Sequence, residues 1–243
     1  MNRLPCPSQN ERLIVALDVS DNQQARQLVE ILGETVSVYK IGLELLMSGE
    51  FFELVRWLQN REKRIFADIK FFDVPATVAR AVRNLARWGV DFATVHGNQA
   101  IMEAANQEKG DMCLLAVTAL TSLDQHDLQD LGFSCNPEEL VVSRAHRAIE
   151  AGLDGVVCSG LETRTLRQVL GSRFLIATPG IRPVVNTAPD DQKRVSTAWD
   201  ALAAGADYVV VGRPVRDAVD PRRVAESLQQ EIRDFSNDAH PKS

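Results

Sequence analysis

Cysteine is scarce in this sequence, and the cysteines present do not form a metal-binding or disulfide pattern. The four of them are scattered along the chain, as Cys6, Cys113, Cys135 and Cys158. Because no C-x-x-C pair occurs, the spacing argues against a zinc site and against a disulfide framework. Reduced thiols of this kind predict a protein of the reducing cytoplasm.

Long apolar runs and runs of basic residues are also missing. Nowhere does the chain have the roughly 18 consecutive apolar residues that a membrane-spanning helix needs, and its first residues lack the apolar stretch of a signal peptide. Lys plus Arg number 27 and Asp plus Glu number 33, which gives a formal net charge of −6. We therefore predict a soluble protein that binds neither membranes nor nucleic acid, and that binds any anionic substrate through a few locally placed cations.

Short β-rich apolar runs alternate with longer segments of helical apolar spacing along the whole chain. Eight runs predict strands: Leu13–Val19, Val36–Ile41, Arg64–Ile69, Asp91–His96, Leu114–Leu120, Gly155–Ser159, Arg173–Thr178 and Asp207–Gly212. The segments between them are long enough for crossover helices, which a parallel sheet requires. Eight such units in 243 residues predict an α/β fold, a single (β/α)8 TIM barrel.

We expect one domain over residues 1–243, with a core from about 11 to 235 and short polar tails, the last from Ser236 onward. An open doubly wound sheet is the alternative. Such a sheet usually carries a Gly-rich phosphate loop after its first strand, where this chain has Asp18-Val19-Ser20-Asp21. A repeated pattern of Gly, an apolar residue and Asp precedes the fourth, sixth and eighth strands and predicts a helix C-cap followed by a turn.

Charged residues recur at the carboxyl ends of the first three predicted strands. Alternation in residues 64–70 places the aliphatic side chains toward the helices and Asp68 and Lys70 toward the barrel interior. Asp18 and Lys40 end the inward-facing series of the first two strands in the same way. Barrel enzymes hold their reacting groups at this end, so these four side chains are candidates for the site. A structural ion pair or a solvated strand end is the alternative for each of them.

Two arginines follow the seventh and eighth predicted strands, Arg182 in T-P-G-I-R and Arg213 in V-V-G-R-P. The loops after these strands frequently form a phosphate site in α/β barrels, and both guanidinium groups could add charge-assisted hydrogen bonds to it. Otherwise they are surface arginines. The arrangement predicts a phosphorylated small molecule whose reacting part lies near the first three strands. The long segment from Pro179 to about Lys193 is a candidate lid.

Two further residues fit an ordinary structural role as well as a functional one. Asp73 precedes a helix that begins with Pro75, so its role is either to cap this helix or to take part in function. His96 ends the fourth strand on the same face as Thr94, where it either borders the site or supports it through a hydrogen bond. No His/Cys/Asp cluster with metal-ligand spacing, nucleophile elbow or Walker loop occurs, so we expect neither a metal ion nor a cofactor.

Taken together, these motifs resemble the orotidine 5′-monophosphate decarboxylase family over nearly the whole chain. The matching segments are V-A-L-D (15–18), Y-K-I-G (39–42), F-A-D-I-K-F-F-D-V-P (66–75), V-T-A-L-T-S (117–122), G-V-V-C-S (155–159), T-P-G-I-R (178–182), D-Q-K-R-V (191–195) and V-G-R-P (211–214). The D-x-K-x-x-D pattern also occurs in sugar-phosphate decarboxylases and synthases of the same superfamily. Its combination with T-P-G-I-R, D-Q-K-R and V-G-R-P is far more specific. The resemblance implies decarboxylation of orotidine 5′-phosphate to UMP and CO2, without metal or cofactor.

The resemblance also implies a role for each matching residue. Lys70 resembles the general acid that protonates C6, and Asp68 resembles the carboxylate beside the leaving CO2. Lys40 and Asp18 resemble the charges that complete the network and contact the ribose. Asp73 and Thr77 resemble a pair that reaches into the neighbouring subunit, which implies a homodimer with shared active sites.

The remaining implied contacts are those with the pyrimidine and the phosphate. Thr121 resembles the residue that contacts the pyrimidine. Gln192 and Arg213, with the Gly212 backbone and help from Arg182, resemble the phosphate site. The segment after His96 is shorter than the Gly-Gly-containing version of many members. A Mg²⁺-dependent sugar-phosphate lyase of the same superfamily and a catalytically silent nucleotide-binding barrel stay open as alternatives.

Overall fold

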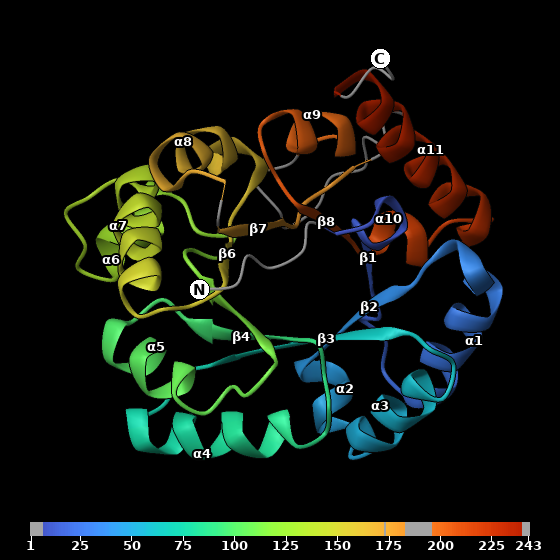
Figure 1. The fold of residues 1–243 in the computed structure, drawn as a ribbon, viewed down its shortest axis with the longest axis horizontal. Coiled ribbons are helices and arrows are strands. Elements are labelled where there is room, and N and C mark those ends of the chain that lie inside the picture. Colours follow the sequence, from blue (N-terminus) through green and yellow to red (C-terminus); the bar gives the residue numbers. More distant parts are fainter. Residues whose placement is uncertain (1–6, 173, 183–195, 240–243) are drawn as a thin grey trace.

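The computed structural model describes residues 7–172, 174–182 and 196–239. Within them, eight parallel strands pair in sequence order and close into a barrel, and Figure 1 shows the helices around the outside of this ring. The strands are β1 (Leu13–Ala16), β2 (Val38–Gly42), β3 (Arg64–Phe71), β4 (Phe92–His96), β5 (Cys113–Val117), β6 (Gly155–Val157), β7 (Leu175–Thr178) and β8 (Tyr208–Val211). The closed sheet confirms the predicted TIM barrel and rules out the open doubly wound alternative.

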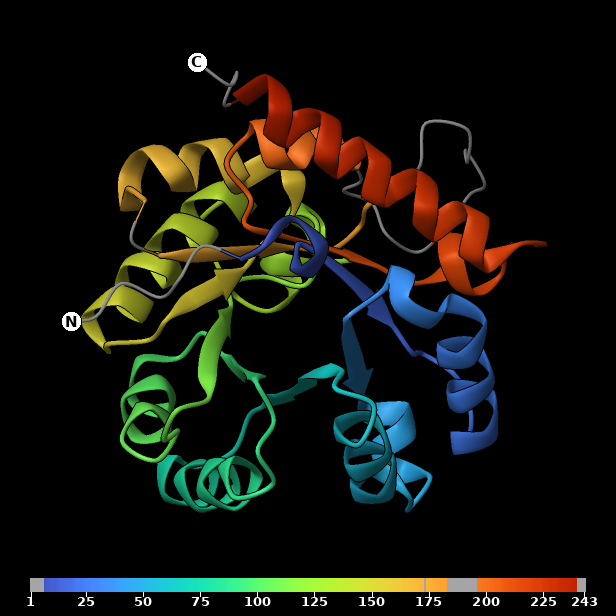
Figure 2. The same ribbon diagram turned by 45° about the vertical axis from the view of Figure 1, so that its right-hand side comes forward.

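Helices connect the strands and form the outer layer of the barrel. They are α1 (Asn22–Leu32), α2 (Leu43–Met47), α3 (Phe51–Gln59), α4 (Pro75–Ala86), α5 (Gln99–Asn106), α6 (Gln125–Asp130), α7 (Pro137–Glu150), α8 (Gly160–Leu170), α9 (Ala198–Ala203), α10 (Arg213–Arg216) and α11 (Pro221–Ala239), with short 3-10 turns at Gln9–Glu11 and Gly33–Thr35. Helix α11 packs against both α9 and α1 and so completes the layer (Figure 2). It continues past Ser236, where the sequence predicts a polar tail. None of the helices in the described ranges is long and apolar enough to span a membrane.

Alternation along the strands divides the buried side chains into two layers. The inner layer fills the barrel and includes Ile14, Val38, Phe66, Phe92 and Tyr208. The outer layer, between strands and helices, includes Val15, Tyr39, Ile65, Ala67 and Ala93. Charged residues therefore continue the inner series of the first three strands, as the alternation predicts. Beyond the packed interior, the charged residues line a cavity at the carboxyl ends of the strands.

An aspartate immediately before β4, β6 and β8 ties each of these strands to the strand that precedes it. Oδ2 of Asp91, Asp154 and Asp207 accepts a hydrogen bond at 2.8 Å from the backbone N–H of Ile65, Leu114 and Ile176, respectively. Each carboxylate also pairs with a cation: Arg64, Lys109 and Arg167 in the same order. We call these three residues the amino-end aspartates.

The glycine two residues before each amino-end aspartate ends the preceding helical segment. Gly89, Gly152 and Gly205 have φ values of 67°, 79° and 109°. This left-handed region strongly favours glycine. Gly152 and Gly205 directly follow the C-cap residues of α7 and α9, as predicted, whereas Gly89 lies two residues after the C-cap residue of α4. In the repeated sequence pattern, the glycine thus follows the end of a helix, and the aspartate two residues later holds together the amino ends of two neighbouring strands.

Candidate active site

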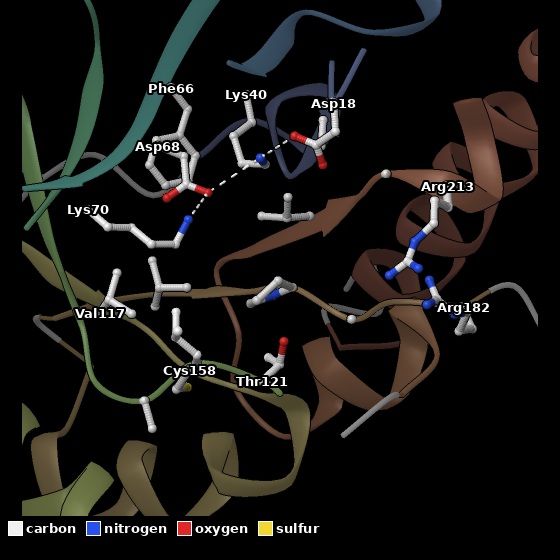
Figure 3. Close-up of a pocket in the computed structure, with 18 residues that line it drawn as sticks. Asp18, Lys40, Phe66, Asp68, Lys70, Val117, Thr121, Cys158, Arg182 and Arg213 are labelled. Atoms are coloured by element: carbon white, nitrogen blue, oxygen red, sulfur yellow. Dashed lines mark hydrogen bonds and ion pairs between the residues drawn. The ribbon is translucent and has the colours of Figure 1, made fainter. Parts of the chain in front are cut away.

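A cavity of about 230 Å³ opens at the carboxyl ends of the strands. It is lined by Ala16, Asp18, Lys40, Phe66, Asp68, Lys70, Val117, Ala119, Leu120, Thr121, Val157, Cys158, Pro179, Gly180, Arg182, Val210, Gly212 and Arg213 (Figure 3). This is the end at which α/β barrels carry their chemistry. The lining brings together most residues predicted for the site: Asp18, Lys40, Asp68, Lys70, Thr121, Arg182, Gly212 and Arg213.

Four of these side chains form a row of alternating charge, which we call the charged array. Lys40 Nζ lies 2.8 Å from Asp18 Oδ1 and 3.4 Å from Asp68 Oδ2, and Lys70 Nζ lies 2.8 Å from the same Asp68 oxygen (Figure 3). The side chains of Lys40 and Asp68 are 12% and 11% exposed, whereas that of Lys70 is 33% exposed. Lys70 therefore presents the ammonium group that is more accessible from the cavity.

The charged array keeps its central members ionised. Burial raises the pKa of the Asp68 carboxyl, but the charges of Lys40 and Lys70 and the hydrogen bonds it accepts outweigh burial, so the pKa lies below its ordinary value. Burial lowers the pKa of Lys40, but Asp68 and Asp18 outweigh it and place this pKa above its ordinary value. The array therefore holds fixed positive and negative charges at one end of the cavity at neutral pH.

An irregularity in the sheet shapes the strand that carries Asp68 and Lys70. Strands β3 and β4 pair at Ala67 and Ala93, and the next pair is Phe71 with Val95, so three β3 residues stand opposite the single residue Thr94. Lys70 has a φ of 54°, in the left-handed region that lysine rarely adopts. Bulges of this kind redirect side chains beside active sites. The sequence pattern predicts that both charged side chains face inward, but not this local geometry.

Apolar side chains line the cavity close to the charged array. Phe66 and Val117 lie on the Lys70 side of the cavity (Figure 3), and Val157 and Leu120 also contribute to the lining. An apolar surface reduces the local dielectric constant and so strengthens the interaction of a charge with Lys70. None of these four residues is among the predicted site residues. Phe66, Val117 and Val157 lie within predicted strands and Leu120 ends one, and this place along the strands is the sequence signal that points to them.

Two guanidinium groups lie at the opposite side of the cavity from Lys70. Arg182 follows β7 and Arg213 follows β8, and Figure 3 shows both apart from the charged array, with Thr121 lining the cavity wall. A Cβ atom at Gly212 would lie 3.4 Å from Asp18 Oδ2, at van der Waals contact, so the Gly212 backbone lies close to the Asp18 carboxylate. The cavity thus has a cationic end that suits an anionic group and a distant end with charges of both signs.

Three residues predicted for the site are not in the cavity lining described here. Asp73 is exposed, and its Oδ1 accepts a hydrogen bond at 2.6 Å from the backbone N–H of Val74. Because Val74 itself is the N-cap residue of α4, Asp73 does not cap that helix. Thr77 is on α4, where its Oγ1 accepts a hydrogen bond from Arg80 at 3.2 Å. Gln192 lies outside the described residues, as does the candidate lid from residue 183 onward.

His96 supports the loop beside the site and is not part of the cavity lining described here. Its Nδ1 lies 2.9 Å from Asn98 Oδ1, and its ring centroid lies 4.6 Å from that of Phe72. Burial lowers the pKa of the imidazole. The ring therefore packs as a half-buried side chain between β4 and the end of β3.

The described residues contain no group of three or more His, Cys, Asp and Glu side chains placed to hold a metal ion. Each of the two carboxylates of the charged array lies within ion-pair distance of a lysine ammonium. The two arginines of the lining suit a ligand anion at the side of the cavity away from the charged array.

Comparison with known proteins places this cavity in a family. The model of the family described as "Orotidine 5'-phosphate decarboxylase / HUMPS family" matches residues 11–228. The chain belongs to this family. The match spans all eight strands, from β1 to β8, and therefore every element that contributes to the cavity.

Members of the family with known names are similar over nearly their full length. An orotidine 5′-phosphate decarboxylase of Methylococcus capsulatus is 60% identical over 92% of this chain and 93% of its own. One from Stenotrophomonas maltophilia is 49% identical over 96% and 97%. The crystal structure of orotidine 5′-phosphate decarboxylase from Lactobacillus acidophilus is 32% identical, with a TM-score of 0.81 over 91% of this chain and 99% of that one.

Proposed function

We propose that the protein converts orotidine 5′-phosphate to UMP and CO2 in pyrimidine biosynthesis, without a metal ion or an organic cofactor. The observation that carries the proposal is the charged array in the cavity, with Lys70 as its exposed ammonium group, in a chain of this family. The names of the similar proteins support the same reaction.

The chemistry of the reaction explains why a lysine is needed at this place. The bond between C6 of the pyrimidine and its carboxylate carbon breaks, CO2 leaves, and the electron pair stays on C6. That pair occupies an sp2 orbital outside the ring π system, so ring delocalisation does not stabilise it. A preorganised positive charge does. The ammonium of Lys70 provides this charge and then transfers a proton from Nζ to C6, which gives UMP.

We assign Asp68 to the position beside the carboxylate that is lost. Its bond of 2.8 Å to Lys70 orients the ammonium group. The second possible role of Asp68 is repulsion between its negative charge and the substrate carboxylate, which would raise the free energy of the bound substrate. Lys40 keeps Asp68 ionised from the other side. We assign Lys40 and Asp18 to contacts with the ribose.

We assign the phosphate group of the substrate to the cationic end of the cavity. Arg182, Arg213 and the Gly212 backbone lie there, and Gln192 completes this set in the resemblance to the family. Thr121 lies between the two ends, where a pyrimidine would be. Binding energy from a phosphate far from C6 can be used to close the site over the reacting ring, and it then raises kcat as well as affinity.

We also propose a homodimer in which Asp73 and Thr77 serve the site of the neighbouring subunit. Phe72 and Val74, which flank Asp73, are 64% and 62% exposed. Exposed apolar side chains grouped in this way are typical of contact surfaces. Asp73 lies outside the cavity lining of its own chain, which fits a role in a second site. The scattered cysteines support a reducing compartment, and we propose the cytoplasm.

The experiment that tests the function is a decarboxylation assay after exhaustive chelation. The absorbance of orotidine 5′-phosphate should fall at an undiminished rate, and Lys70→Ala should lower kcat by at least about 10²- to 10³-fold, as loss of one preorganised donor does. UMP should still bind this variant, because the phosphate end is intact.

The same assay separates the alternatives. Activity that disappears on chelation and returns with Mg²⁺, together with turnover of a ketose phosphate, identifies a sugar-phosphate lyase. Tight UMP binding without any turnover identifies a silent nucleotide-binding barrel. Full activity of Lys70→Ala contradicts its assignment as the acid.

A further inference from the structure

The hydroxyl group of Thr94 connects the two residues at the reacting end of the cavity. Its Oγ1 donates a hydrogen bond to Asp68 Oδ1 at 3.0 Å and accepts one from the backbone N–H of Lys70 at 2.9 Å. The side chain is fully buried and lies behind the cavity lining. We propose that Thr94 is a positioning residue, which fixes the Lys70 ammonium relative to the Asp68 carboxylate. This inference rests on the function proposed above.

The irregular pairing of β3 and β4 explains why a hydroxyl group is needed here. Asp68, Ile69 and Lys70 all stand opposite Thr94, so the regular ladder is interrupted between Ala67 and Phe71. The Lys70 N–H donates to the Thr94 side chain in place of a strand carbonyl. Without that acceptor, a partly buried N–H loses its hydrogen bond, which is costly in a protein interior. The hydroxyl group thus stabilises the bulge from which Lys70 extends.

The backbone of Lys70 depends on such support. Its φ of 54° is unfavourable for a residue with a side chain, and a backbone of this kind persists only where the surroundings hold it. Thr94 holds the N–H of Lys70, and Asp68 holds its Nζ at 2.8 Å. Because Thr94 also binds Asp68, both ends of the lysine are fixed to one hydrogen-bonded unit. Loss of the hydroxyl group would free the lysine backbone and one carboxylate oxygen together.

The hydroxyl group also acts on the charge of Asp68. The charged groups that face this carboxylate are Lys40 from β2 and Lys70 from its own strand, with Asp18 beyond Lys40. Strand β4 contributes the uncharged Thr94, and His96 two residues later bonds to Asn98 instead. Burial raises the pKa of Asp68, whereas the two lysines and the Thr94 hydrogen bond lower it and prevail. Removal of the hydroxyl group should therefore raise the pKa of Asp68.

Three variants separate positioning from folding. Thr94→Val removes the hydroxyl group at nearly constant volume, and Thr94→Ser keeps it. Thr118→Val is the matched control, because Thr118 is equally buried and its Oγ1 donates to the Val157 carbonyl at 3.0 Å, away from the charged array. Steady-state kinetics with orotidine 5′-phosphate across a pH series, UMP affinity and melting temperature are measured for each. The pKa of Asp68 is followed directly by ¹³C carboxyl NMR.

We expect Thr94→Val to lower kcat by about 10- to 100-fold, which is the range for loss of a hydrogen bond to a charged group. UMP affinity should stay within about twofold, because product binding at the arginines is unaffected. The pKa of Asp68 and the acidic limb of kcat against pH should both move to higher pH. Thr94→Ser should restore most of kcat, and Thr118→Val should keep kcat while losing some stability.

Several results would overturn the inference. One is a Thr94→Val enzyme with unchanged kcat and an unchanged Asp68 pKa. Another is equal loss of kcat in Thr94→Val and Thr94→Ser, or in Thr118→Val. If the wild-type protein itself fails to decarboxylate the nucleotide, the proposed function fails instead, and the NMR titration still decides whether Thr94 controls Asp68.

Discussion

The ammonium group of Lys40 lies 2.8 Å from Oδ1 of Asp18, a residue that belongs to the loop after the preceding strand. This contact joins the carboxyl ends of two neighbouring strands. It also places Lys40 between two carboxylates, since Asp68 lies on its other side at 3.4 Å. The protonation of Lys40 therefore depends on Asp18 as well as on Asp68.

Asp18→Asn should make Lys40 easier to deprotonate. Burial lowers the pKa of Lys40, and Asp68 and Asp18 together raise it above its ordinary value of 10.5. With one carboxylate neutralised, the pKa should fall, and the alkaline limb of kcat/KM against pH should move to lower pH. Since the folded pKa is raised, the stabilisation from Lys40 is complete below about pH 10.5 and is lost as pH rises through the folded value. In the variant this loss should begin at lower pH.

Glu44→Gln is the control for Asp18→Asn. Glu44 is an exposed carboxylate on α2, in the same region of the barrel. Its replacement should leave the alkaline limb in place. An alkaline limb that is the same in Asp18→Asn and in the wild-type protein, as measured by pH-rate profiles, would show that Asp18 does not control Lys40.

Arg213→Ala should reduce turnover through loss of phosphate binding. With orotidine 5′-phosphate, both kcat and affinity should fall, because remote binding energy is used to reach the transition state. With orotidine, which lacks the phosphate, the loss should be smaller. Arg222→Ala, at an exposed position on α11, is the control and should leave kcat and affinity for both substrates unchanged. Equal losses on the two substrates, in parallel steady-state assays, would contradict the phosphate assignment.

Mixed dimers should test whether subunits share their sites. Asp73→Asn and Lys70→Ala subunits should each be nearly inactive alone. In a mixed dimer, one of the two sites combines an intact Lys70 from one chain with an intact Asp73 from the other. Mixing should therefore restore up to about half the wild-type activity per mixed dimer. If mass spectrometry verifies the mixed dimers and no activity returns, the shared site is wrong.

Asp154→Ala should destabilise the fold and leave catalysis unchanged. The Asp154 carboxylate accepts from the Leu114 N–H at 2.8 Å and pairs with Lys109 at the amino end of β6. Its loss should lower the free energy of unfolding by about 1–3 kcal/mol, the cost of an unsatisfied buried donor. Asp111→Ala, at an exposed position nearby, is the control in urea denaturation. A large fall in kcat at unchanged stability would place Asp154 in the catalytic machinery instead.

The sequence predicts the barrel well because strand and helix periodicities carry the fold directly. All eight predicted strands exist, but the structure ends several of them earlier at the carboxyl end: β1 ends at Ala16, β5 at Val117 and β6 at Val157. The residues beyond, such as Asp18, continue the apolar or alternating pattern while the chain already turns into a loop. Pattern alone does not distinguish a strand end from the first loop residue.

The sequence also predicts the charged array, because a charged side chain that faces the interior of a barrel is costly to bury unless it lies at the open end beside a partner of opposite sign. It does not predict the left-handed backbone of Lys70 or the bulge opposite Thr94, since both depend on how β3 and β4 pair in space. Thr94 is simply an inward-facing polar residue in the sequence. Its hydrogen bonds to Asp68 and Lys70 are found only in the folded structure.

The amino-end aspartates have no counterpart before β2, where Ser37 stands in place of a carboxylate. At this seam Ser37 Oγ and the buried Gln229 of α11 both donate to the Asn10 carbonyl, and Gln229 also reaches the Thr35 carbonyl. The amino ends of β1 and β2 are thus held together by a residue of the last helix, whereas an aspartate next to the strand does this for the pairs β3–β4, β5–β6 and β7–β8. Truncating α11 before Gln229 should therefore separate the amino ends of the first and second strands, although no residue of the cavity would have been removed.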